Sequence, residues 1–228
     1  MEPVSDGLDP GVDQVLAGRR AALLDLDGTL VDSEPANQAA YRAYFTARGW
    51  DAGPEVLRAF AGRRGEEVFA QLPGPWTGED TDALVEGVLS HLDHEAHPLR
   101  PVPGAAELVR RLHAAGVAIA LVTSAGRWWA ERAIGDVLGI RDLFAELVTA
   151  ETTSAGKPDP SPYLAGAAAL GVPPADAVAL EDTVPGVRSA LSAGVGLVIG
   201  IATGTSPQVL LDGGAHRVVA GPAELLRS

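Results

Sequence analysis

The feature that most constrains the fold is the alternation of short apolar runs with helical stretches in the C-terminal part of the chain. Apolar runs occur at 117–123, 145–150, 176–181, 195–201 and 216–221. Stretches of about ten residues with helical spacing lie between the first four of these runs. Strands that alternate with helices of this length predict βαβ units and a mostly parallel sheet.

A further buried strand is predicted at 19–26, in "RRAALLDL". Between this strand and the alternating part, residues 35–98 show several helical stretches and no strand pattern, so they predict an all-helical insert. We therefore expect an α/β protein in three parts. These are a loose N-terminal arm at 1–18, a core built from 19–34 and 99–228, and the helical insert.

The charge and cysteine content exclude several classes of function. The 228 residues carry a net charge of −13, which argues against nucleic acid and anionic membranes as main partners. The absence of cysteine excludes disulfides and thiol chemistry. No apolar run reaches the roughly 18 residues of a membrane span, and the N-terminus lacks the pattern of a signal peptide. We expect a cytoplasmic protein that is a monomer or a weak dimer.

Several residues with reactive or charged side chains follow the predicted strands directly. Ligands of open α/β sheets bind beyond the carboxyl ends of the strands, so residues at those ends are candidates for a site. Paired acids follow two of the strands, a Thr-Ser pair follows another, and a lysine lies in a loop before a crossover helix. The candidates are Asp25, Asp27, Thr123, Ser124, Lys157, Glu181 and Asp182.

The acids at this edge predict a metal ion. Side chains alternate along a strand, so Asp25 and Asp27 begin on the same side. Two neighbouring carboxylates stay ionised in a desolvated site only when a cation compensates them. Mg²⁺ is the natural candidate, because it favours carboxylates together with substrate phosphate. Lys157 is the only lysine among the 17 basic residues, which indicates a role that arginine does not fill.

Together these motifs resemble those of the haloacid dehalogenase-like superfamily of phosphatases. The first motif is "DLDGTLVDS" (25–33), the second is Thr123, the third is Lys157 in "GKPDP", and the fourth is "ALEDTVPGVRSALSAG" (179–194). The helical insert resembles the cap of the subgroup that includes β-phosphoglucomutase and small sugar phosphatases. The resemblance implies a Rossmann-like core with an inserted cap.

The resemblance also implies a role for each candidate residue. Asp25 would attack phosphorus in line and form an aspartyl-phosphate. Asp27 would protonate the leaving oxygen and then activate water for the second step. Thr123, Ser124 and Lys157 would hold the phosphoryl oxygens.

The metal ligands implied by the resemblance are Asp25, the backbone carbonyl of Asp27, and Asp182, with Glu181 as a further candidate. The expected activity is hydrolysis of a small phosphorylated metabolite, a sugar or polyol phosphate, with Mg²⁺ as cofactor. Such chemistry depends on positioning and charge neutralisation, which this set of residues supplies.

The sequence also bears on other activities of the superfamily. Dehalogenases lack the second acid of the first motif, which is present here as Asp27, and phosphonate-cleaving relatives need a cap lysine that this insert lacks. A phosphosugar mutase stays open as an alternative, although Asn37 stands where the mutases carry histidine. Arg63 and Arg64 of the insert could face the site and bind a second anionic group or the sugar hydroxyls of a substrate. A non-catalytic binding or regulatory domain is the remaining alternative.

A few residues outside the motifs are also of interest for the site. Arg127 lies within reach of the predicted site. Of the pair Trp128 and Trp129, one is expected to pack under the helix and the other to line the substrate entrance. "HLDHEAH" (91–97) spaces three histidines at intervals that zinc could use on a helix, but this acidic segment favours a solvated helical face.

Overall fold

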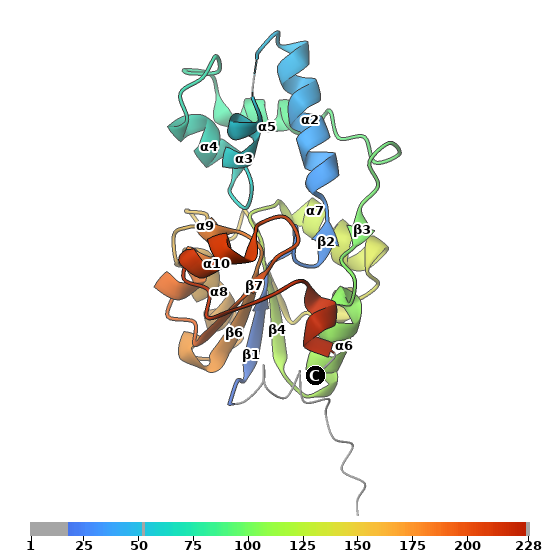
Figure 1. The fold of residues 1–228 in the computed structure, drawn as a ribbon, viewed down its shortest axis with the longest axis vertical. Helices are drawn as coiled ribbons and strands as arrows, with labels where there is room; N and C mark the ends of the chain where they lie inside the picture. The colour runs from blue at the N-terminus through green and yellow to red at the C-terminus, as the bar shows by residue number, and fades with distance from the viewer. Residues whose placement is uncertain (1–17, 52, 227–228) are drawn as a thin grey trace, which may run out of the picture.

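The computed structural model describes residues 18–51 and 53–226. These residues form a core around a parallel sheet and a helical cap, which stands above the core in Figure 1. The predicted N-terminal arm lies outside the described residues, except for Gly18. Of the described helices, none combines the length and the apolar character needed to cross a membrane.

In the described part of the chain, six strands form the core sheet in the order β5-β4-β1-β6-β7-β8, and each neighbouring pair is parallel. This confirms the predicted α/β, Rossmann-like core. The strands are β1 (Ala21–Leu24), β4 (Ala118–Val122), β5 (Glu146–Val148), β6 (Ala177–Glu181), β7 (Leu197–Ile201) and β8 (Arg217–Val219).

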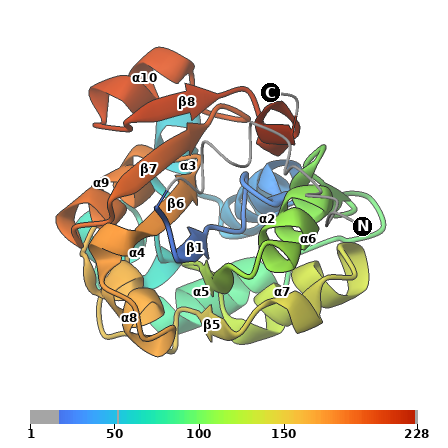
Figure 2. The same cartoon turned by 90° about the horizontal axis from the view of Figure 1, so that it is seen from below.

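Helices cover both faces of this sheet, as Figure 2 shows. Alternate residues of β1 belong to two different clusters: Ala22 and Leu24 pack toward α6 and α7, and Ala21 and Leu23 pack toward α8, α9 and α10. The core helices are α6 (Ala105–Ala114), α7 (Arg127–Arg132), α8 (Ser161–Ala169), α9 (Val184–Ser192) and α10 (Pro207–Asp212), with helical turns at Ala133–Val137, Arg141–Leu143, Pro174–Asp176 and Pro222–Leu226. Burial on both faces explains the almost continuous apolar character of the strand sequences.

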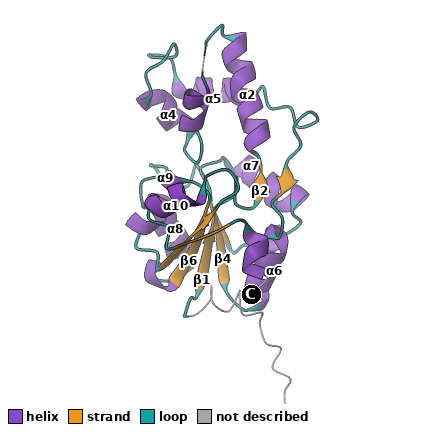
Figure 3. Cartoon of the chain, viewed as in Figure 1, coloured by secondary structure: helices purple, strands orange, loops and turns teal. Residues whose placement is uncertain are grey.

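The insert folds into helices and loops (Figure 3). Its helices are α2 (Glu34–Ala47), α3 (Pro54–Ala59), α4 (Gly65–Gln71) and α5 (Thr81–Leu89). The two segments that join cap and core pair with each other as β2 (Val31–Asp32) and β3 (Arg100–Pro101), which the sequence did not predict. The predicted boundaries of the insert, between residues 34 and 35 and between residues 98 and 99, stay a prediction.

The cap has a hydrophobic core of its own, built mainly from aromatic rings. Phe45 of α2 stacks on Trp76, with 5.4 Å between the ring centroids and 14° between the planes. Phe69 of α4 meets Trp76 edge-on at 5.5 Å, and Trp50 does so at 5.8 Å. Such aromatic pairs contribute stability beyond the area they bury, so they stabilise the interior of the cap.

One predicted helix is shorter than expected. The sequence pattern predicted that the helix containing α5 continues to His97, but α5 ends at Leu89. The Ser90 hydroxyl donates to the Gly87 carbonyl, and the Asp93 carboxylate accepts from the backbone N–H of Glu95 and of Ala96. These local bonds offer the backbone an alternative to helix, so the three histidines do not share a helical face.

The aromatic packing of the cap predicts that Phe45→Ala lowers the free energy of unfolding by about 3–5 kcal/mol, because it removes a buried ring and leaves a cavity. Phe45 is 2 % exposed. Chemical denaturation measures the change, and Leu89→Ala in the same cap is the control, because Leu89 is 54 % exposed. Equal losses in the two variants would contradict this account.

Candidate active site

The site is organised around a buried ion cluster at the carboxyl ends of β1 and β6. The Lys157 ammonium lies 2.6 Å from Oδ1 of Asp25 and 2.5 Å from Oε1 of Glu181, and it donates to the Val122 carbonyl at 2.9 Å. Lys157 and the two carboxylates are almost fully buried. Burial alone would lower the pKa of Lys157, but the charges of Asp25 and Glu181 outweigh it and hold the pKa above its usual value, so the ammonium stays charged.

Glu181 is tied into this cluster through both of its oxygens. Oε1 also accepts a hydrogen bond from the Tyr163 hydroxyl at 2.6 Å, and Oε2 accepts one from Thr183 at 3.3 Å. Burial, followed by the charge of Asp25, raises the pKa of Glu181 to about 7, against the opposing effect of Lys157. Gly186 makes this position possible, because a Cβ there would lie 1.9 Å from the carboxylate.

Asp27 lies beside this cluster with a different set of partners. Its Oδ1 accepts hydrogen bonds from the Ser33 hydroxyl at 2.5 Å and from Nε1 of Trp129 at 2.9 Å. Burial raises the pKa of Asp27 to about 6, and the neighbouring charge of Asp25 adds to this, although the two hydrogen bonds act in the opposite direction. A carboxyl group with such a pKa exchanges protons readily near neutral pH.

The acids of β1 and β6 form a group that fits a divalent cation. Carboxylate oxygens of Asp25, Glu181 and Asp182 lie within 4.8 Å of one another. Oδ2 of Asp25 and Oδ1 of Asp182 are buried and have no hydrogen-bond partner in the described part of the chain. Burial, together with the charges of Asp25 and Glu181, raises the pKa of Asp182 well above its usual range. The unpaired, buried oxygen of Asp182 within this acidic group is a hard donor of the kind that suits Mg²⁺.

The backbone at Gly28 lets Asp182 approach this group. Gly28 adopts a φ of +81°, and a Cβ on it would lie 2.0 Å from Oδ2 of Asp182. Only glycine accepts both the left-handed conformation and the close contact without strain. The position of Asp182 in the fourth motif therefore explains why the first motif has a glycine at position 28.

Thr123 and Ser124 follow β4 and lie on the same edge. The Thr123 side chain is buried, and its hydroxyl accepts a hydrogen bond from the backbone N–H of Ala125. The Ser124 hydroxyl donates to the Gly62 carbonyl of the cap at 3.2 Å. Both residues line the cleft between cap and core, as Asp25 and Asp27 do. The two predicted phosphate-binding hydroxyls therefore share this cleft with the acids.

The three arginines predicted to contact substrate lie in different surroundings. Arg64 is buried and donates to the carbonyl and hydroxyl of Thr153 in the core at 2.8 and 2.6 Å, and Arg63 donates to Gln71. Both line the cleft. Arg127 is exposed, pairs with Glu131, and is not among the described residues that line the cleft.

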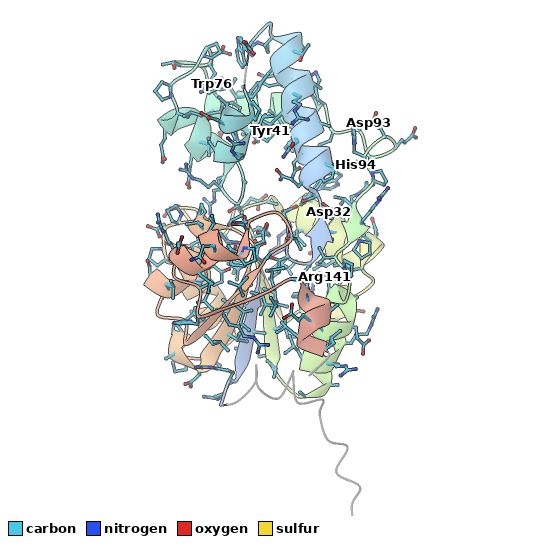
Figure 4. All side chains as sticks on the ribbon, viewed as in Figure 1. Asp32, Tyr41, Trp76, Asp93, His94 and Arg141 are labelled. Atoms are coloured by element: carbon cyan, nitrogen blue, oxygen red, sulfur yellow. The ribbon has the colours of Figure 1, made fainter. Side chains whose placement is uncertain are left out.

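The cleft lies between cap and core and has a volume of about 2130 Å³. On one side it is lined by the cap segment 61–67, where Glu67 at the start of α4 accepts a hydrogen bond from the backbone N–H of Gly156 at 2.6 Å. On another side it is lined by Trp128, which is 62 % exposed, while Trp129 is buried beside it. The burial of one tryptophan agrees with the sequence prediction, although Trp129 also lines the cleft; that Trp128 lines the substrate entrance stays a prediction. Figure 4 places His94 at the junction of cap and core.

Comparison with known proteins agrees with this geometry. The family model described as "haloacid dehalogenase-like hydrolase" matches residues 19–194, more than half of the chain. The chain belongs to the haloacid dehalogenase-like hydrolases. Within that family it is a phosphatase, a phosphoric monoester hydrolase, related to β-phosphoglucomutase, CbbY and hexitol phosphatases. The resemblance inferred from the four motifs is therefore confirmed.

Two relatives of known activity are similar over most of their length. The chain is 35 % identical over 194 residues to validoxylamine A 7'-phosphate phosphatase of Streptomyces hygroscopicus subsp. limoneus, covering 85 % of this chain and 90 % of that protein. It is 35 % identical over 193 residues to hexitol phosphatase A of Escherichia coli (strain K12), covering 82 % and 85 %.

Solved structures share the fold. A hydrolase from Pseudomonas syringae superimposes with a TM-score of 0.83 and 26 % identity, over 91 % of this chain and 96 % of that one. A putative β-phosphoglucomutase from Thermotoga maritima superimposes with a TM-score of 0.69 and 26 % identity over the same shares. These likenesses confirm the parallel core with a helical cap.

Some residues of the site were not predicted from the sequence. Ser33 directly precedes α2, where a serine commonly caps a helix, but its hydroxyl makes no capping bond and donates to Asp27 instead. Tyr163, which orients Glu181, had no signal beyond an aromatic residue in a helix. One tryptophan of the pair 128/129 was expected to pack, with no indication of which; the hydrogen bond from Trp129 to Asp27 joins positions 102 residues apart, which no local pattern indicates.

The contact between Gly28 and Asp182 predicts that Gly28→Ala displaces the acid and raises the Mg²⁺ concentration needed for half-maximal phosphatase activity by about tenfold, the effect typical of disturbing the surroundings of a metal site. Gly116→Ala is the matched control, because Gly116 has a φ of +74° but no atom within 4 Å of an added Cβ. Titration with Mg²⁺ measures the shift. A similar shift in both variants would show that backbone strain, and not Asp182, is responsible.

Proposed function

We propose that the protein is a Mg²⁺-dependent phosphatase that hydrolyses a sugar or polyol phosphate through an aspartyl-phosphate on Asp25. One observation carries this proposal: Asp25 is buried at the base of the cleft, its Oδ1 is held by Lys157, and its Oδ2 has no partner within the described residues. A carboxylate fixed through one oxygen, with the other free beside a large cleft, is placed to act as a nucleophile.

In the first step, Oδ2 of Asp25 forms a bond to phosphorus while the bond from phosphorus to the ester oxygen breaks. The Asp27 carboxyl group donates its proton to that departing oxygen, so the product leaves as an alcohol. The Lys157 ammonium and the Thr123 hydroxyl stabilise the charge on the phosphoryl oxygens. Lys157 is suited to this because Glu181 and Asp25 fix its position.

In the second step, water attacks phosphorus and the bond to Oδ2 of Asp25 breaks, which releases inorganic phosphate. Asp27, now deprotonated, takes the proton from the water. The same carboxyl group therefore gives a proton in one step and takes one in the next. Its raised pKa suits both roles near neutral pH.

We propose that Asp25, Asp182 and the backbone carbonyl of Asp27 hold Mg²⁺. When bound, the ion neutralises the carboxylates and withdraws charge from the phosphoryl group. Glu181 was expected as a further metal ligand, but for this residue we favour a positioning role toward Lys157. Both of its oxygens already accept hydrogen bonds, from Lys157 and Tyr163 on one side and from Thr183 on the other.

The size of the cleft and the names of the relatives support a polyhydroxylated substrate. A cleft of about 2130 Å³ leaves room for a sugar or polyol beyond the phosphoryl group. The relatives act on validoxylamine A 7'-phosphate and on hexitol phosphates. Arg64 and Glu67 bind the cap segment 61–67 to the core, so we propose that this segment shields the reacting phosphate from bulk water.

The proposal predicts that Asp25→Asn abolishes Mg²⁺-dependent release of phosphate from p-nitrophenyl phosphate, because the amide is not a nucleophile. Loss of roughly a thousandfold or more in kcat is expected. Circular dichroism monitors folding, and Asp142→Asn at an exposed position is the control. If Asp25→Asn stays active and folded, Asp25 is not the nucleophile.

The choice between phosphatase and mutase is tested with a panel of hexitol, sugar and nucleoside monophosphates. We expect kcat/KM to be highest for hexitol or sugar phosphates, with inorganic phosphate as the product. Asn37 donates weakly to Ser33 at 3.5 Å and offers no acid or base of its own, so isomerisation of a sugar phosphate should be absent. Efficient isomerisation with a sugar bisphosphate activator would show that the protein is a mutase.

A further inference from the structure

We propose that Trp129 is a positioning residue for the acid–base carboxyl group, and that its indole N–H holds Asp27 so that Oδ2 exchanges the proton with substrate and water. This inference rests on the proposed function and names a residue outside the four motifs. The geometry that carries it is the hydrogen bond of 2.9 Å from Nε1 of Trp129 to Oδ1 of Asp27.

Two donors converge on the same oxygen of Asp27. The Ser33 hydroxyl and the Trp129 indole both donate to Oδ1, whereas Oδ2 takes part in no hydrogen bond within the described residues. A carboxyl group held through one oxygen has a defined orientation, and its proton resides on the other oxygen because Oδ1 already accepts two hydrogen bonds. This arrangement leaves Oδ2 for the ester oxygen and then for water.

Trp129 is held firmly enough to act in this way. Its side chain is 6 % exposed and packs in the hydrophobic cluster on the α7 side of the sheet. The His94 ring lies against it, with 5.6 Å between the centroids. The start of α7 is fixed by Glu151, which accepts the backbone N–H of Arg127 at 3.0 Å. A buried indole has two side-chain torsions and places its donor accurately, as a residue that supports an active site must.

The two donors reach Asp27 from different parts of the fold. Ser33 lies on the segment that leads into the cap, and Trp129 lies in α7 of the core. Ser33 directly precedes the first cap helix, α2, whereas Trp129 packs in the hydrophobic cluster of the core. Trp129 therefore supplies the hydrogen bond that keeps Asp27 oriented against the core.

If Trp129 positions Asp27, the effect of removing its N–H on the rate should depend on the leaving group of the substrate. An alkyl phosphate such as sorbitol 6-phosphate expels a strongly basic oxygen and needs the proton from Asp27, while p-nitrophenyl phosphate expels a stable phenolate that needs none. The quantity kcat/KM covers the steps up to departure of the alcohol, so the water step does not enter. Poor orientation of Asp27 should therefore slow the first substrate and spare the second.

The test compares kcat/KM of the two substrates in the wild-type protein, in Trp129→Phe and in Trp50→Phe, with saturating Mg²⁺. Trp129→Phe keeps an aromatic ring and removes the N–H. We expect a loss of about tenfold or more for sorbitol 6-phosphate and a change of less than about twofold for p-nitrophenyl phosphate. Trp50→Phe is the control, because Trp50 packs in the cap and is not among the described residues that line the cleft; it should leave the ratio of the two constants unchanged.

Replacement of Trp129 by benzothienylalanine, which has the bicyclic shape of indole without the N–H, gives the same test if the phenylalanine variant folds poorly. Equal losses for both substrates, or no loss for either, would overturn the proposal and leave Trp129 a packing residue. Activity of the wild-type protein toward p-nitrophenyl phosphate is the separate check of the proposed function, since its absence would refute both.

Discussion

The arrangement of the site depends on one buried ammonium group held between two carboxylates. Lys157 contacts Asp25 and Glu181 within 2.6 Å, and all three side chains are almost inaccessible to water. Removing one member of such a cluster leaves an uncompensated buried charge, which costs far more than an exposed ion pair contributes. The cluster therefore fixes the position of Asp25 at the end of β1, and the neighbouring groups are arranged around it.

The parallel sheet brings these groups together. The strands β4, β1 and β6 are neighbours, so their carboxyl ends deliver Thr123, Asp25 and Glu181 to one edge although they are far apart in the chain. Two glycines then permit approaches that a side chain would block, Gly28 toward Asp182 and Gly186 toward Glu181. The dense packing of acids thus rests on backbone positions without a Cβ.

The strand-end residues could be predicted because their placement follows from general geometry: Asp25 and Lys157 belong to segments that any open parallel sheet brings to one edge. The bond from Trp129 to Asp27 could not, since it depends on how α7 packs against the loop after β1. The pairing of β2 with β3 is too short to leave a periodic pattern. The early end of α5 follows from competition by the Asp93 side chain, which the helical spacing did not reveal.

The charge balance gives an independent reason to expect dependence on a divalent cation. The protein carries a net charge of −13, and Lys157, its only lysine, is already compensated by two carboxylates. Asp182 and Asp27 add further acidic groups within the same buried space. A phosphate dianion that enters this space meets a local excess of negative charge, and the ammonium of Lys157 alone does not offset it. We therefore expect binding of the substrate to need a second source of positive charge beside Asp25, and the unpaired carboxylate oxygen of Asp182 is a place where the chain can hold it.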